Sequence, residues 1–499
     1  MFNFKSLLAN PFAKMVHHRL QKEAKTAVKD QQNILNQLVN IGQRTVFGKE
    51  HGFDKVSDYA SFKQAVPIRD YEGFKSYIEM VKKGTPNVLW KGLPIYFAKT
   101  SGTTSGVKYI PITKDSISNH INGARNAILT YMATTGNTAF AGGRMIFLSG
   151  SPELERVGGI ATGRLSGIVN HHIPAYLRKN QLPSFETNCI EEWEEKLEKV
   201  VEETLGKDMT LIGGIPPWMQ MYFDSLVTKT GKPVKDLFPN LQLLVQGGVN
   251  FEPYKTKLFE TIGKEIDTIE LFPASEGFFA FQDRRNEPGL LLNTKAGIFY
   301  EFIPLAEVHN QNPTRLSLGE VKLDEQYALI INSNAGLWGY SIGDTVKFVS
   351  VDPYRIIVSG RVKHFISAFG EHVIGEEVEQ ALLKAANEMK VSVVEFTVAP
   401  FIAQGEGKSY HEWFIEFEKA PVDMELFRDK LNAHMCEKNV YYKDLIDGHI
   451  LETLKISSLQ KNAFINYMRA QGKLGGQNKV PRLSNDRIIA NDLTNYINK

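Results

Sequence analysis

Cysteine is nearly absent from this chain, which has only Cys189 and Cys436 among its 499 residues. So few thiols, so far apart, exclude a disulfide-rich secreted scaffold and a cysteine-rich metal site. The adjacent His171 and His172 lack the i, i+4 spacing of a helical zinc pair, so we expect no metal there. Such sparse cysteine is typical of a reducing cytoplasm.

Net charge and long apolar runs are also lacking. Lys and Arg together number 58 and Asp and Glu 56, giving a formal net charge of +2 at pH 7, so we expect no nucleic-acid partner. No uninterrupted apolar segment approaches the roughly 20 residues that cross a bilayer. The N-terminal apolar run is broken by Asn10 and Pro11, unlike a secretory signal. We therefore expect a cytoplasmic protein without a membrane partner.

The best-known phosphate loops are missing as well, although one stretch has their composition. The segment "FAKTSGTTSGVKYIPIT" spans residues 97–113. It is not a Walker loop, because Val107 separates Gly106 from Lys108, and it does not match G-x-G-x-x-G. Its hydroxyls, glycines and lysine suit phosphate oxygens, but the same composition is typical of a surface turn. The loop alone leaves both readings open.

What is present predicts an α/β fold. Short apolar segments that end in Gly, Pro or Ser, such as "RMIFLSGS" and "LQLLVQGGV", alternate with helical stretches, which favours a mostly parallel sheet. After about Ala296 the pattern becomes hairpin-like and predicts a β-rich subdomain. We expect a large N-terminal domain over residues 1–359 and a small, mobile α+β domain over residues 360–499, with a hinge near Gly360.

Two helices are predicted before the loop. Apolar residues recur at spacings near 3.6 from Ala13 to Phe47, which predicts one long amphipathic helix. A second helix follows Asp70, whose side chain is suited to cap it.

Four segments in a fixed order resemble the motifs of acyl-adenylate-forming enzymes, the ANL superfamily. They are "TSGTTSGVKYIPIT", "LFPASEGFFAFQ", "NSNAGLWGYSIGDTVKF" and "SGRVKHFISAFGEHVI". More closely, the chain resembles the acyl acid-amido synthetases of the auxin-responsive promoter family, the plant hormone-conjugating enzymes and their bacterial relatives. "GGIPPW", "FYEFIPL" and "GGQNKVPRLSND" share that family's character, and the likeness spans essentially the whole chain.

The resemblance implies a ligase that uses ATP and Mg²⁺ in two steps. A carboxylic acid attacks ATP to give an acyl-adenylate and pyrophosphate, and an amino acid then displaces AMP. Catalytic roles are implied for Lys108, Glu276 and Lys479, with Glu276 also a metal ligand. The implied ATP and AMP ligands are Thr100, Ser101, Gly102, Thr103, Thr104, Gly248, Ser275, Glu276, Gly277, Asp344, Arg361 and His372.

This chain departs from the plant enzymes at two positions. They tend to carry Arg before the Gly-Asp pair, where this chain has Ser341, and a phosphate-contacting lysine where it has His372. A neutral imidazole is a poorer pyrophosphate ligand than lysine. Either change could alter hinge behaviour or the acceptor substrate.

Structural alternatives stand beside three of these roles. Ser275 could cap a helix after a strand, Asp344 could make a turn between β segments, and Lys479 could be a solvated tail lysine. Trp218, Met221 and Val249 are our candidates for the apolar wall of an acyl pocket.

The functional prediction is a monomeric enzyme whose partners are a small-molecule carboxylic acid and an amino acid. An acyl-CoA ligase with the same adenylate, and a sensor that binds nucleotide or acyl group without turnover, are the alternatives. The sequence does not identify the acid or the amino acid.

Overall fold

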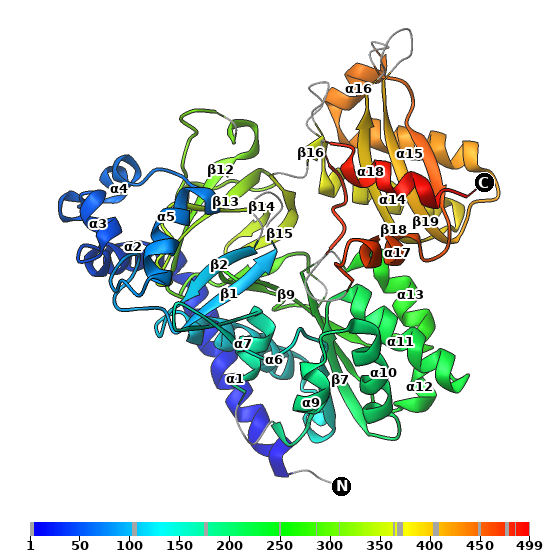
Figure 1. Ribbon diagram of the computed structural model, residues 1–499, viewed down its shortest axis with the longest axis horizontal. Helices are drawn as coiled ribbons and strands as arrows, with labels where there is room; N and C mark the ends of the chain where they lie inside the picture. The colour runs from blue at the N-terminus through cyan, green and yellow to red at the C-terminus, as the bar shows by residue number, and fades with distance from the viewer. Residues whose placement is uncertain are drawn as a thin grey trace. The chain divides into compact units, whose positions relative to one another are not determined.

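The computed structural model describes residues 4–101, 107–173, 178–248, 251–285, 287–308, 310–362, 365–366, 373–402, 409–447, 451–474, 479–484 and 486–498. The chain forms two compact units (Figure 1). The large unit comprises residues 1–251 and 258–358, and the small unit comprises residues 252–257 and 359–499.

The helix predicted over residues 13–47 is wrong as a single element, because it is broken at Thr26. Thr26 leaves the helical backbone region, and its hydroxyl donates to the Glu23 carbonyl and to Asp30 Oδ2 at 3.1 and 2.7 Å. Threonine hydroxyls compete with helical hydrogen bonds in this way. This break separates α1 (Phe4–Lys25) from α2 (Ala27–Gly42), and a second break at residues 43–45 separates α2 from the short α3 (Val46–Glu50).

Two more helices precede the first strands of the large unit. They are α4 (Tyr59–Ala65) and α5 (Tyr71–Lys82). The prediction that Asp70 caps the second is confirmed, since its Oδ1 accepts the Glu72 amide at 3.1 Å.

An eleven-stranded mixed sheet forms the centre of the large unit. Its order is β12-β13-β14-β15-β11-β10-β9-β8-β7-β3-β6. Pairing is parallel among β6, β3, β7, β8 and β9, and antiparallel in the described pairs beyond β9. The predicted parallel sheet and the predicted β-rich region are thus continuous, because the β9–β10 hairpin reverses the strand direction.

The strands of this sheet have the following bounds: β3 Arg144–Phe147, β6 Gln181–Leu182, β7 Met209–Gly214, β8 Leu243–Gly247, β9 Asp267–Ala274, β10 Gly277–Phe281, β11 Leu290–Leu292, β12 Ile298–Pro304, β13 Gln326–Ser333, β14 Tyr340–Val351 and β15 Tyr354–Arg361. A second, four-stranded sheet has the order β2-β1-β5-β4, with β1 Tyr96–Ser101, β2 Val107–Ile112, β4 Glu155–Val157 and β5 Ile160–Gly163.

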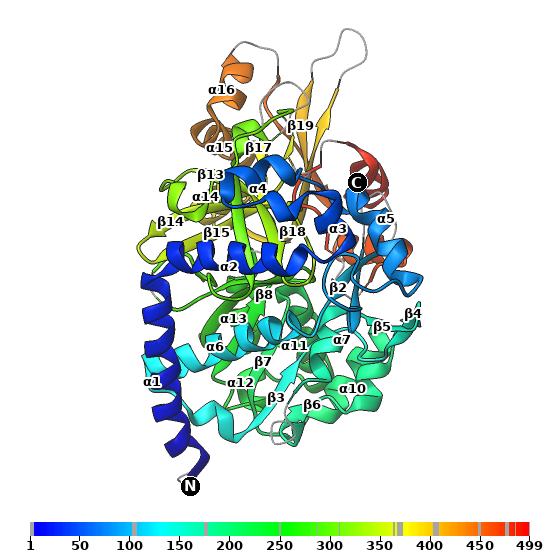
Figure 2. The same ribbon diagram turned by 90° about the vertical axis from the view of Figure 1, so that its left-hand side faces the viewer.

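Helices cover the parallel half of the large sheet. α1 packs along α6 (Ile117–Thr135), which lies against β9 and β10 (Figure 1). α11 (Pro216–Thr230) lies against β7, and α10 (Trp193–Thr204) packs on α11 and beside β6. The antiparallel half meets α2 instead (Figure 2), where the Gln31 amide donates to the Thr294 and Ile298 carbonyls at 2.8 and 2.9 Å. The remaining helices are α7 Leu165–Asn170, α9 Phe185–Cys189, α12 Val234–Leu237 and α13 Glu252–Ile262.

The small unit has its own core around a three-stranded sheet. β18 (Ser392–Phe401) pairs antiparallel with β19 (Tyr410–Lys419), which pairs parallel with β20 (Lys455–Leu459). The buried core includes Trp413 of β19. The other elements are β16 Phe365–Ile366, β17 Val373–Ile374, α14 Gly375–Met389, α15 Met424–Lys438, α16 Val440–Asp447, α17 Ala463–Ala470 and α18 Ile488–Leu493.

Among the residues that the structure describes, no helix combines the length and the apolar character that spanning a membrane requires.

Candidate active site

The predicted phosphate loop is closed by a β-hairpin. β1 and β2 pair antiparallel, so Thr100 lies opposite Lys108 and Ser101 lies opposite Val107. Thr100 and Lys108 are half-buried. Gly102, Thr103 and Thr104 lie outside the described residues. The hairpin brings the first and last predicted ligands of the loop to the same end of the two strands.

Lys108 lies against the N-terminus of α5. Its ammonium nitrogen is 5.8 Å from the centre of the Tyr71 ring, and the Tyr71 hydroxyl accepts the Tyr109 amide at 2.9 Å. Burial raises the pKa of Tyr71, so this hydroxyl stays protonated at neutral pH. The contacts of Tyr71 fix β2 against α5.

The segment before α5 is also bonded to the start of β14. The Arg69 amide donates to the Gly339 carbonyl at 2.9 Å, and the Ser341 amide donates to the Arg69 carbonyl at 2.8 Å. Between these bonds, the Tyr340 ring packs edge-on against Phe74 with 5.5 Å between centres. The loop hairpin, α5 and β14 are therefore one connected structure.

Glu276 lies in the two-residue turn between β9 and β10. Ala274 pairs with Gly277 across this turn, so the alternative of a helix capped by Ser275 is wrong. A Cβ on Gly277 would lie 2.6 Å from Ile298 Cδ1, which explains the glycine. The Tyr340 hydroxyl donates to Glu276 Oε1 at 3.4 Å. Burial, followed by the Glu276 charge, raises the pKa of Tyr340 far above its usual value.

Asp344 lies in a β-bulge within β14. Ala328 pairs with Thr345 and Ile330 with Ser341, so the register shifts between them. Gly343 has a φ of +85°, which glycine adopts without strain. The alternative of a turn between two strands is therefore wrong. The bulge leaves Asp344 9% exposed, and bulges commonly redirect a side chain next to an active site.

The other predicted residues of the large unit follow β7 and β8. Gly248 comes directly after β8 and has a φ of +85°, while Val249 lies outside the described residues. Trp218, near the start of α11, is buried and packs on Trp193 with 4.7 Å between ring centres. Met221, one turn further along α11, is half-buried.

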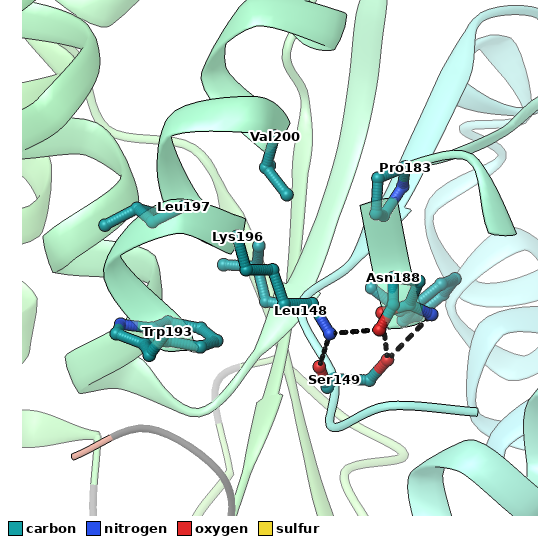
Figure 3. A pocket seen from close by; sticks show the side chains of 9 residues that line it. Leu148, Ser149, Pro183, Asn188, Trp193, Lys196, Leu197 and Val200 are labelled. Atoms are coloured by element: carbon teal, nitrogen blue, oxygen red, sulfur yellow. Dashed lines mark hydrogen bonds between the residues drawn. The ribbon is translucent and has the colours of Figure 1, made fainter. Parts of the chain in front are cut away.

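Trp193 also lines a small cavity, but Trp218 and Met221 do not line it. Its walls come from the end of β3, the residues around α9, and α10 (Figure 3). Lys196 reaches from α10 and donates to the carbonyls of Ser149 and Asn188 at 2.9 and 2.6 Å. Burial lowers the pKa of Lys196 to about 8. The cavity has room for one water molecule and not for an acyl group.

Lys479 in the small unit is exposed and precedes a well-anchored segment. The Val398 amide donates to the Arg482 carbonyl at 2.9 Å, and the Ser484 amide donates to the Val398 carbonyl at 2.9 Å, which adds this segment to the edge of β18. The backbone of Arg361 ends β15, while its side chain and His372 lie outside what the structure describes.

The donor set near Glu276 fits a magnesium nucleotide better than a bound metal alone. No group of three or more His, Cys, Asp or Glu side chains arranged to hold a metal occurs among the described residues. Mg²⁺ often takes only one or two protein carboxylates and completes its octahedron with phosphate oxygens and water. Glu276, half-buried beside the Tyr340 hydroxyl, can supply one such carboxylate.

Solved structures define the fold class. The chain aligns with a GH3.15 acyl acid amido synthetase in complex with 2,4-DB at a TM-score of 0.79 and 15% identity, covering 97% of this chain and 96% of that one. It also aligns with a 2-hydroxyisobutyryl-CoA ligase holding an adenylate, at a TM-score of 0.55 and 12% identity, over 97% and 91%. The fold is that of the adenylate-forming ligases.

Sequence comparison identifies the family. Residues 16–188 match the GH3 family N-terminal domain, residues 291–361 its central domain and residues 376–488 its C-terminal domain. The chain therefore belongs to the GH3 family. A jasmonoyl–L-amino acid synthetase, JAR4 of Nicotiana attenuata, is 22% identical over 92% of this chain and 91% of its own. JAR6 of the same plant is 23% identical over 87% and 85%.

Sequence reasoning missed Tyr71 and Tyr340, which join Lys108 and Glu276 to the rest of the site. Tyr340 stands in the quoted "GYSIGD", three residues before Gly343. Because Tyr340 lies in a recognised motif, it could have been considered as a site residue. Nothing in the sequence indicated that its hydroxyl meets Glu276.

Proposed function

We propose that this chain is an ATP-dependent acyl acid-amido synthetase. The observation that supports this most is the connected arrangement of Lys108, Tyr340, Glu276 and the bulge at Asp344 in a chain of the GH3 family. An ammonium, a hydroxyl and carboxylates are the kinds of group that bind phosphates, magnesium and ribose hydroxyls. Here they lie on strands and a helix that are joined to one another by hydrogen bonds.

In the first half-reaction, a carboxylate oxygen of the acid forms a bond to the α-phosphorus of ATP, and the bond to pyrophosphate breaks. Negative charges meet in this step, so catalysis consists mainly of positioning and neutralisation. Lys108 and the loop hydroxyls hold the leaving phosphates, and Asp344 accepts hydrogen bonds from the two ribose hydroxyls. Bound Mg²⁺, held by Glu276 and phosphate oxygens, would supply further neutralisation.

In the second half-reaction, the amine of an amino acid attacks the acyl carbon and AMP leaves with the carbon–oxygen bond electrons. The proton that the amine loses passes to solvent. During the first half-reaction Lys479 offsets charge on the α-phosphate or carboxylate oxygens. The small unit then rotates about Gly360 between the two half-reactions. Arg361, His372 and the backbone of Gly248, Ser275 and Gly277 contribute further nucleotide contacts in this scheme.

The acyl group would lie against Trp218, Met221 and Val249, beyond the ends of β7 and β8. We propose that the protein works as a monomer in the cytoplasm, where ATP is available and its two cysteines stay reduced.

The test is ATP–pyrophosphate exchange with Mg²⁺ across a panel of aryl, indole, aliphatic and jasmonic acids. Jasmonic acid is included because two relatives are named for its conjugation. Exchange that depends on one acid is expected. Bound ATP with no exchange for any acid would favour a sensor without turnover.

The acceptor is tested separately. Amino acids and coenzyme A are added in turn to the preformed adenylate, and amide formation with an amino acid is expected. A thioester as the sole product would overturn the amido synthetase and support an acyl-CoA ligase.

A further inference from the structure

A buried polar cluster lies beside the β13–β14 turn of the large unit. Glu301 of β12 and Asn332 of β13 both have 0% exposure, and Arg315 has a side chain only 8% exposed. The strand register places Glu301 opposite Ile330 and Phe299 opposite Asn332, so Glu301 and Asn332 are diagonal neighbours on one face of the sheet.

Hydrogen bonds satisfy the Glu301 carboxylate completely. Oε2 accepts from Arg315 Nε at 2.7 Å and from the Tyr59 hydroxyl at 3.1 Å. Oε1 accepts from Arg315 Nη2 at 2.8 Å and from Asn332 Nδ2 at 2.7 Å. Arg315 Nη1 also donates to the carbonyls of Lys63 and Val66 at 3.1 and 2.5 Å, which ties the cluster to the end of α4.

The Asn332 side chain has a hydrogen-bond partner on each side and so connects this cluster to the residue before β14. While its amide nitrogen donates to Glu301, its Oδ1 accepts the Gly339 amide at 2.6 Å. Gly339 has a φ of +54°, and a Cβ there would lie 2.6 Å from the Pro67 carbonyl oxygen. The Gly339 backbone is therefore confined by its conformation, by its surroundings and by the Asn332 side chain.

Gly339 is the residue directly before the nucleotide-site segment. Its carbonyl accepts the Arg69 amide, Tyr340 follows with its hydroxyl on Glu276, and the same strand continues to the bulge at Asp344. A shift of Gly339 would move both Tyr340 and the start of the bulge.

We propose that Asn332, held by the Glu301–Arg315 pair, is a positioning residue that fixes Tyr340 and Asp344 for nucleotide binding. This inference rests on the proposed function. Stability alone does not account for such a cluster, because replacing a buried ion pair with apolar side chains often costs a protein nothing. A fully satisfied polar network does hold its members in one geometry, as a nucleotide site requires.

The test compares Asn332→Ala with wild type in binding and in turnover. We expect the Kd for ATP and the KM for ATP to rise about tenfold, because one buried donor and one buried acceptor lose their partners. The KM for the acid should change less than twofold. Asp283→Asn is the matched control, since Asp283 and Arg355 form another buried bidentate pair in the same unit, at 2.9 and 2.7 Å. It should lower the Tm without changing the KM for ATP.

Asn332→Asp gives an isosteric second variant with a readout in pH. When protonated, the new carboxyl can donate to Glu301 and accept from Gly339 as asparagine does. Burial and the Glu301 charge favour that form at low pH, and Arg315 and Tyr59 are the other ionisable groups of the cluster. The ratio of variant to wild-type KM for ATP should be near one at pH 6 and about tenfold at pH 9, as the charged form breaks the contact.

The outcomes distinguish a failure of the positioning role of Asn332 from a failure of the proposed function of the chain. A lowered Tm with unchanged ATP binding in Asn332→Ala, or a KM ratio in Asn332→Asp that is flat with pH, would limit the cluster to folding and overturn the positioning role. Should Asn332→Ala not fold, the pH series of Asn332→Asp decides alone. A wild-type chain that does not bind ATP would overturn the proposed function itself.

Discussion

Arg315 in the large unit and Arg482 in the small unit are both largely buried, but one meets a single carboxylate and the other meets two. Arg315 pairs with Glu301 through Nε and Nη2, and its Nη1 donates to two backbone carbonyls. Arg482 contacts Glu379 of α14 and Glu395 of β18, with each of the three side chains about 15% exposed. Each arginine anchors a segment with a predicted site residue, Asp344 in the large unit and Lys479 in the small unit.

The difference lies in how far the anchor reaches. In the large unit, side-chain hydrogen bonds run from Arg315 through Glu301 and Asn332 to the strand that carries Asp344. In the small unit, Arg482 binds Glu379 of α14, Glu395 of β18 and the Tyr254 hydroxyl of α13, so its bonds anchor its own segment directly. Lys479 lies three residues earlier in that segment and is exposed. A precise, preformed contact is thus expected from Asp344, and an adjustable one from Lys479.

The largest expected effect is on stability, from removing either arginine. Arg315→Met leaves the fully buried Glu301 without its cation and should lower the free energy of unfolding by about 4 kcal/mol. Arg482→Met should cost about 2 kcal/mol, since Glu379 and Glu395 are each about 15% exposed whereas Glu301 is fully buried. Urea unfolding measures both.

Tryptophan fluorescence assigns the loss to a unit, because Trp413 is the small unit's tryptophan and the other four lie in the large unit. Repeating each measurement with Trp413→Phe removes the small unit's signal. Arg284→Met, which breaks an exposed pair with Glu287, is the control and should cost less than about 1 kcal/mol. Equal losses for the two buried arginines would contradict the comparison.

Asp344→Ala should weaken ATP binding by about a hundredfold, because two hydrogen bonds to the ribose are lost in a buried position. Folding should change little, since the side chain lies in a bulge rather than in the core. Isothermal titration with ATP and a thermal melt measure the two effects. Asp352→Ala, on the same hairpin but exposed, is the control. A lower Tm with unchanged ATP affinity would remove Asp344 from the site.

Glu377 should give the small unit a contribution of its own to the pH dependence of stability. Its Oε2 accepts the Ile374 amide and Asn439 Nδ2 at 3.1 and 2.9 Å, and burial raises its pKa from 4.5 to about 7. At pH values between 4.5 and about 7, the Glu377 carboxyl is protonated in the folded chain and ionised in the unfolded chain. The contribution of Glu377 to the free energy of unfolding therefore falls as pH rises through this window.

Glu377→Gln should remove about 2 kcal/mol of this fall between pH 5 and pH 7, because the amide oxygen accepts the same bonds without titrating. Urea unfolding of variant and wild type at both pH values gives the difference. Parallel pH curves for the two proteins would show that Glu377 titrates normally.

The smallest effect is expected for Lys479→Ala, which should slow adenylation about tenfold and leave ATP affinity unchanged. The exposed ammonium contributes when the reacting charge develops and not when ATP binds. Pre-steady-state pyrophosphate release measures the step, with the exposed Lys461→Ala as control. A loss of ATP affinity equal to that of Asp344→Ala would mean that the two units do not differ in this respect.

Local patterns predicted the elements well where the sequence carried a physical signal. Asp70 before an amphipathic stretch gave the cap of α5, and the Gly-, Pro- or Ser-terminated apolar runs gave β3, β7, β8 and β9. The break at Thr26 was missed because the apolar spacing continues across it, while one hydroxyl forms the competing bonds. The turn at Ser275 and the bulge at Asp344 were each open to a second interpretation, because the same short polar sequences suit caps, turns and bulges.

The sequence motifs predicted which residues belong to the candidate site, but they did not predict the contacts that join those residues. Lys108, Glu276 and Asp344 stand far apart in the chain, and Tyr71 and Tyr340 link them through contacts that no local spacing indicates. Asn332 begins the quoted "NSNAGLWGYSIGDTVKF" and Arg315 lies in none of the quoted motifs. Neither residue was recognised as part of a cluster, because a buried asparagine or arginine is identified only by the partners around it.

The sequence by itself determined the family, the α/β character and the chemistry of the loop, since these follow from residue types and their order. Only the tertiary structure decided that the parallel and antiparallel strands form one sheet and that Asp344 lies in a bulge. It alone also decided that Asn332 and Glu301 form a buried hydrogen bond. The reason is physical: helix periods and turn preferences act between near neighbours, whereas buried hydrogen bonds join residues whose separation is set by the whole fold.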